Sequence, residues 1–185
     1  KFALSQACIT HTYLQQDPKI DDTFQKKFSA LKDQTASLQE VKTSILILMQ
    51  MMRDHYGKPV ILLIDEYDVP IAKASAKGYY PEMLEVIKGL MSTALKDNDA
   101  LRFAVITGCL RIAKESIFTG TNNFVSDTIS SSHLNEYFGF TQADVDQILK
   151  DADCMEHADD IKSWYDGYHF GDLDVYCPWD VMNYL

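Results

Sequence analysis

The sequence predicts an α/β fold in which a parallel sheet follows a group of N-terminal helices and precedes a small C-terminal helical lid. Two continuous apolar runs, VILLI at 60–64 and LRFAVIT at 101–107, are typical of strands buried on both faces of such a sheet. Between them, residues 81–96 repeat apolar side chains at helical spacing and open with Pro81. A strand, a helix and a strand in this order form a βαβ unit, whose two strands run parallel.

The first 56 residues predict three helices. Apolar side chains recur there at three- and four-residue steps, and the stretch contains no glycine and a single proline, Pro18. Ser37 and Glu40 have the spacing of a capping box at the start of the third helix, and Gly57 follows its end. The expected helices span residues 2–15, 20–33 and 37–56.

The C-terminal part predicts a separate helical appendage. Thr141 and Asp144 have the spacing of a second capping box, which begins a clear helix. After it, two short helices are expected around a loop that contains aromatic residues and glycine, with the aromatic side chains packing the lid. A shift in composition near residue 140 therefore divides the chain into a core at 1–140 and a lid region at 141–185.

Charge and composition exclude several classes of function. A net charge of −10 and a pI near 4.8 repel phosphate backbones and anionic lipid, so neither direct nucleic-acid binding nor membrane binding is expected. No apolar run approaches the roughly 20 residues that span a bilayer. The four cysteines are scattered without a CxxC pair, which favours reduced thiols and a cytoplasmic location.

Three carboxylates follow the first predicted strand, in the stretch VILLIDEYDVP. They are Asp65, Glu66 and Asp68. Charges are costly to bury, and the carboxyl ends of parallel strands meet at the ligand-binding edge of an open α/β sheet. We therefore expect the acids to leave the core at the same edge as Thr107 and Arg111, which follow the second strand.

Aliphatic residues followed by Asp-Glu at the end of a strand are typical of a Walker B element. In that chemistry Asp65 holds Mg²⁺, usually through a water, and Glu66 orients and deprotonates the water that attacks the γ-phosphate. The Thr107 hydroxyl and the Arg111 guanidinium are suited to sensing and stabilising phosphate charge. The alternatives are an ordinary acidic turn, a Thr107 that hydrogen-bonds only that turn, and an Arg111 that pairs with Glu66 or Asp68.

Other readings of the acids fit less well. An aspartyl phosphatase needs two aspartates separated by one residue, whereas Asp65 and Asp68 are separated by two. A metal-dependent nuclease needs an acid followed, a strand later, by Glu-x-Lys, whereas Glu85 and Lys88 are one residue too far apart and lie in the predicted helix. The nucleophile-elbow sequence GxSxG is absent. The phosphate-binding sequence GxxxxGK[ST] is absent as well, so these residues by themselves should bind ATP poorly.

Several blocks of the chain resemble the predicted AAA-ATPase-like family of bacteria. They are IDEYDVPI at 64–71, KGYYPEMLEVIKGLMSTALKDN at 77–98, TGCLRIAKESIFTGTNNF at 107–124, SSHLNEYFGFT at 131–141 and WYDGYHFGDLDVYCPWDVMNYL at 164–185. The resemblance is close from residue 60 to the end and loose before residue 56. It implies a partial P-loop NTPase core within a longer parent that carries a Walker A region and often a nuclease-like domain.

The resemblance also implies which residues form the site. Asp65 and Glu66 match the Walker B acids, with Asp65 as the metal ligand and Glu66 as a catalytic residue. Thr107 falls at the sensor position, and Arg111 belongs to the TGxLR block as a second catalytic residue. Asp68 is assigned to cofactor binding beside Thr107.

For the parent protein we therefore expect a nucleotide partner, the cofactors Mg²⁺ and ATP, and a possible homo-oligomer. The isolated chain is expected to be inactive. The alternative is an interaction or regulatory module that uses the same fold without catalysis.

Overall fold

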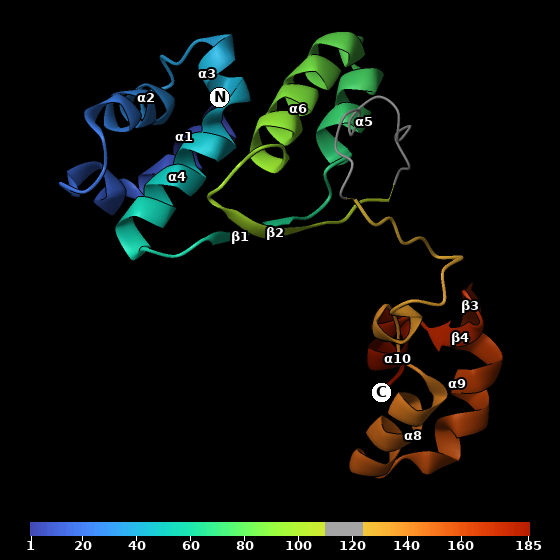
Figure 1. The fold of residues 1–185 in the computed structure, drawn as a ribbon. Helices are drawn as coiled ribbons and strands as arrows, with labels where there is room; N and C mark the ends of the chain where they lie inside the picture. Colours follow the sequence, from blue (N-terminus) through green and yellow to red (C-terminus); the bar gives the residue numbers. More distant parts are fainter. Residues whose placement is uncertain (110–123) are drawn as a thin grey trace. The chain divides into compact units, whose positions relative to one another are not determined.

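The computed structural model is an α/β structure with many helices and a small parallel sheet, as Figure 1 shows. It describes residues 1–109 and 124–185, apart from the side chains of residues 165 and 166. The chain divides into two compact units, Lys1–Asn123 and Phe124–Leu185. No helix of the described residues is both long and apolar enough to cross a membrane.

The first unit combines helices with a pair of parallel strands. Within residues 1–109 its elements are α1 (Phe2–Thr10), the 3₁₀ helix η1 (Thr12–Gln16), α2 (Asp22–Lys32), α3 (Leu38–Lys42), α4 (Ser44–Tyr56), β1 (Val60–Ile64), α5 (Val69–Ala76), α6 (Tyr80–Leu95) and β2 (Leu101–Ile106). The predicted strands and the helix between them are confirmed to within one residue. The eight-residue helix α5 was not predicted.

Two of the predicted N-terminal helices are interrupted. The first ends at Thr10 and continues only as η1, and the third breaks at Thr43 into α3 and α4. At the second break the Thr43 hydroxyl donates to the carbonyls of Gln39 and Glu40, at 3.2 and 3.3 Å. Hydroxyl side chains that bond to the preceding turn in this way compete with the helical ladder. The capping box of Ser37 and Glu40 is confirmed at the start of α3.

The strands β1 and β2 pair in parallel, and helices cover one face of the pair. Val60 and Leu62 pack against the cluster of Met49 in α4, Ala94 in α6 and Ala100, the residue before β2. Ile64 and Ile106 pack against Ile71, Ile87 and Met91 of α5 and α6. In Figure 1 these helices lie on the same side of the strands.

The opposite face of the pair corrects the expectation of a central strand buried on both faces. Ile61 and Leu63 of β1 are 51% and 71% exposed, and Phe103 and Val105 of β2 are each 48% exposed. Within the described residues β1 pairs with β2 alone, and helices cover one face. The continuous apolar run of β1 thus meets helices at every second residue only.

The second unit consists of helices around an antiparallel hairpin. Its elements are the 3₁₀ helix η2 (Asn135–Tyr137), α8 (Gln142–Asp151), the 3₁₀ helix η3 (Met155–His157), α9 (Ala158–Tyr165), β3 (Asp166–Phe170), β4 (Leu173–Tyr176) and α10 (Pro178–Tyr184). The capping box of Thr141 and Asp144 is confirmed at the start of α8. The hairpin stands where an irregular loop was expected, because Gly171, at φ +62°, permits a tight turn.

The core of the second unit is largely aliphatic. It contains Val145, Leu149, Ile161, Tyr176 and Val181. Of the aromatic side chains that were expected to pack the lid, three are on its surface instead: Trp164 is 76%, Trp179 75% and Tyr168 52% exposed, whereas Phe170 is partly buried. Helical spacing and strand alternation direct these side chains outward, which their size and apolar character alone do not reveal.

The two units meet along the chain at residues 123 and 124, earlier than the boundary expected near residue 140. The intervening segment packs on the second unit. The backbone of Phe140 exchanges hydrogen bonds with that of Tyr176, and the Asn135 amide donates to Asp172 and to the carbonyl of Phe170. Contacts with the hairpin, rather than composition, place this segment in the second unit.

Candidate functional site

The candidate site lies where β1 and β2 end. Ile64 pairs with Ile106 in the parallel register, and the backbone continues this ladder past both strands. The Thr107 amide donates to the carbonyl of Ile64 at 2.9 Å, and the Tyr67 amide donates to the carbonyl of Thr107 at 3.1 Å. The two chain segments that follow the strands therefore stay paired, which brings Asp65 and Thr107 together.

Asp65 and Thr107 are directly hydrogen-bonded. The Thr107 hydroxyl donates to Oδ1 of Asp65, and the same oxygen accepts the backbone amide of Glu66 at 3.0 Å. Both side chains are exposed. A carboxylate and a hydroxyl are hard oxygen donors, of the kind that Mg²⁺ prefers together with water and phosphate oxygens. These two residues therefore fit a magnesium site that is open to solvent.

Glu66 stands in an unusual backbone conformation. Its φ of +52° places a non-glycine residue in the left-handed region, which costs of order 1–3 kcal/mol. The next turn begins here, since the amide of Val69 donates to the carbonyl of Glu66 at 3.1 Å. Such outliers persist where the surroundings fix them, and they cluster at functional sites. At the solvent-exposed Glu66 the backbone thus leaves the extended conformation of the preceding strand.

Asp68 differs from the other two acids because it is buried. Its exposed fraction is 3%, and its Oδ1 accepts the backbone amide of Cys109 at 3.3 Å. Among the described residues, no three His, Cys, Asp or Glu side chains gather as ligands for one metal ion. A magnesium ion held here would thus depend on water and phosphate oxygens as well as on Asp65.

The structure brings together Asp65, Glu66, Asp68 and Thr107 at one edge of the sheet. Their proximity was predicted from the parallel strands, and it is observed. Arg111, and the neighbouring Lys114, Glu115, Ser116, Asn122 and Asn123, lie outside the described residues. The geometry alone tests no catalytic or binding role for any residue of either group.

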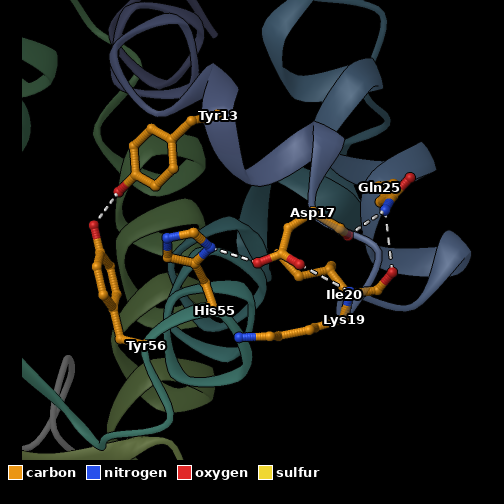
Figure 2. A network of polar contacts seen from close by, with 7 residues as sticks. All are labelled: Tyr13, Asp17, Lys19, Ile20, Gln25, His55 and Tyr56. Carbon is orange, nitrogen blue, oxygen red and sulfur yellow. Dashed lines mark hydrogen bonds and ion pairs between the residues drawn. The ribbon is translucent and has the colours of Figure 1, made fainter.

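A second polar cluster, which the sequence did not predict, joins η1 to the end of α4. We call it the Asp17–His55 network (Figure 2). Nδ1 of His55 lies 2.5 Å from Oδ2 of Asp17, and the hydroxyls of Tyr13 and Tyr56 are 2.9 Å apart. The partners are 38 and 43 residues apart in the chain, so no local pattern announces their contact.

The Asp17–His55 network shifts two ionisation equilibria. The backbone amide of Lys19, and then the ring of His55, lower the pKa of Asp17. Burial, together with the hydrogen bond to Tyr56, raises the pKa of Tyr13 to about 12. The network joins η1 and the residue after it to the C-terminal end of α4, as Figure 2 shows.

Comparison with known proteins gives one family and one curated relative. Residues 5–118, more than half of the chain, match the family described as "Predicted AAA-ATPase". An uncharacterized protein in the vnfD 5' region of Azotobacter chroococcum mcd 1 is 35% identical over 130 residues, which cover 68% of this chain and 24% of that protein. The chain thus matches about a quarter of the length of this relative. No solved structure matches this chain.

The matched residues 5–118 include both strands and every residue of the candidate site. The match therefore concerns the sheet edge described above as well as the N-terminal helices. The chain belongs to the predicted AAA-ATPase family.

Proposed function

We propose that the chain is the part of a magnesium-dependent ATPase that contributes the Walker B acids and the sensor threonine. The observation that supports this most strongly is the direct contact between Asp65 and Thr107 at the ends of two adjacent parallel strands. Family membership adds the expectation of nucleotide binding. In this proposal a phosphate-binding loop, which the 185 residues do not contain, is supplied by sequence outside them.

The proposal gives each residue a distinct role. Asp65 holds a hydrated Mg²⁺, which when bound neutralises charge on the phosphate oxygens. Glu66 orients the attacking water and accepts its proton. Thr107, whose hydroxyl already contacts Asp65, responds to the γ-phosphate. Arg111 stabilises the charge that develops on the transferred phosphoryl group.

The proposal is tested by ATP turnover in the full-length protein that contains these residues. We predict Mg²⁺-dependent turnover, which Glu66→Gln lowers by about 100-fold or more while ATP binding persists. The substitution keeps the size of the side chain and removes its capacity to accept a proton. Steady-state hydrolysis and equilibrium binding of ATP measure the two effects separately.

The matched control is Glu82→Gln, which makes the same chemical change at an exposed position in the first turn of α6. It should leave turnover unchanged. Unchanged turnover in Glu66→Gln would remove Glu66 from the mechanism. A wild-type protein without turnover would favour the interaction module instead.

A further inference from the structure

A buried carboxylate lies directly behind the candidate site. Asp68 immediately precedes α5 and is 3% exposed. Aspartate is rarely buried without a partner, because removing the charge from water is costly. Oδ1 of Asp68 accepts the backbone amide of Cys109, which is 41 residues away in the sequence. The side chain thus links the turn after β1 to the segment after β2.

The segment after β2 lies so close to this turn that a side chain at residue 108 would displace its neighbours. A Cβ atom on Gly108 would lie 2.6 Å from Oδ1 of Asp68 and 2.6 Å from the ring of Tyr67. Contacts this short require glycine or a shift of the neighbours. With the hydrogen bond from the Tyr67 amide to the Thr107 carbonyl, residues 107–109 are held against residues 67–68 on both sides of Gly108.

We propose that Asp68 is a positioning residue, which fixes residues 107–109 so that the Thr107 hydroxyl faces Asp65. This replaces the sequence-based assignment of Asp68 to cofactor binding. A side chain with 3% exposure offers little surface to a nucleotide, whereas Asp65 and Thr107 are exposed. The functional purpose of this positioning rests on the proposed function. The hydrogen bond between Asp68 and the Cys109 amide does not depend on that proposal.

The link is tested in the 185-residue chain by hydrogen exchange of the Cys109 amide, followed by NMR. Asp68→Ala removes the acceptor and should speed this exchange about tenfold. Asp68→Asn retains a carbonyl oxygen at the same position and should keep the rate within about threefold of wild type. The amide of Met91 inside α6 reports whether the fold is intact.

Gly108→Ala provides a second variant that leaves Asp68 in place. Its added methyl should push residues 107–109 away and speed the Cys109 exchange as well. Gly167→Ala is the matched control, because a Cβ there meets no atom within 4 Å. Cys109 exchange that stays within twofold of wild type in either Asp68→Ala or Gly108→Ala, with Met91 protected, would overturn the inference.

A positioning role and a ligand role also differ in the kinetics of the full-length protein. Positioning predicts that Asp68→Ala lowers kcat about tenfold or more while the Mg²⁺ concentration for half-maximal activity changes less than twofold. Asp68→Asn should restore most of kcat. A ligand role predicts instead that Asp68→Asn raises the Mg²⁺ requirement, and that result would overturn the inference. Absence of wild-type turnover would count against the proposed function, and Cys109 exchange would still decide the positioning role.

Discussion

Two aspartates three residues apart occupy opposite environments at the end of β1. Asp65 is exposed and bonded to Thr107, whereas Asp68 is 3% exposed and bonded to the Cys109 amide. The left-handed backbone of Glu66 lies between them and turns the chain from strand to helix. The two aspartates thus differ in what they can bind, since only the exposed carboxylate of Asp65 is accessible to a solvated ion.

The ionisation of Asp17 couples the stability of the fold to pH. Its pKa is lowered by the Lys19 amide and by His55, so the folded state favours the charged form. A lowered folded pKa contributes stability at pH above the unfolded value of about 3.9, and this contribution is lost as pH falls through the folded pKa. We predict that the free energy of unfolding decreases as the pH is lowered from about 5 to 3.

Urea denaturation of wild type and Asp17→Asn over this pH range measures the effect. The variant should be less stable than wild type at pH 6, and its stability should depend less steeply on pH. Other carboxyls with lowered pKa values, Asp21, Glu40, Glu85 and Asp144, contribute to the slope that remains. An Asp17→Asn profile parallel to that of wild type would contradict the assignment.

At the scale of elements, β1 has one covered and one exposed face. Leu62 packs against the cluster formed with α4 and α6, whereas Leu63, the next residue, is 71% exposed. We predict that Leu62→Ala destabilises the chain by about 2–3 kcal/mol. Leu63→Ala, the matched control in the same strand, should cost less than about 1 kcal/mol. Equal losses in denaturant unfolding would show that both faces are packed.

The elements that could be predicted are those with a local cause. The run at 60–64 and the helical spacing at 81–96 yielded β1 and α6, and the two capping boxes marked α3 and α8. The hairpin β3–β4 and the break at Thr43 depend on turn geometry and hydroxyl bonds, which apolar spacing does not reveal.

The candidate site was predictable in part for the same reason. Parallel strands place their ends together, so the proximity of Asp65 and Thr107 follows from topology. The burial of Asp68 depends on a contact with Cys109, and the Asp17–His55 network joins residues 38 positions apart. Such contacts arise from tertiary packing, and a single sequence contains no local trace of them.

At the scale of the whole molecule, the chain contains two units with separate cores. The family match at 5–118 falls within the first unit, which holds the candidate site, while the second unit has its own aliphatic core. The chain matches about a quarter of its curated relative. We therefore propose that ATP is hydrolysed by the full-length protein and not by these residues alone.

In the proposed site, Asp65 and Thr107 share one metal and nucleotide. The most direct test is paramagnetic broadening of threonine methyl signals by Mn²⁺ with ATP in the full-length protein. We predict that the Thr107 methyl signal broadens, that Thr93 within α6 serves as the less affected reference, and that Asp65→Asn abolishes the difference. A Thr107 signal that stays sharp while Mn²⁺ and ATP bind would contradict the account.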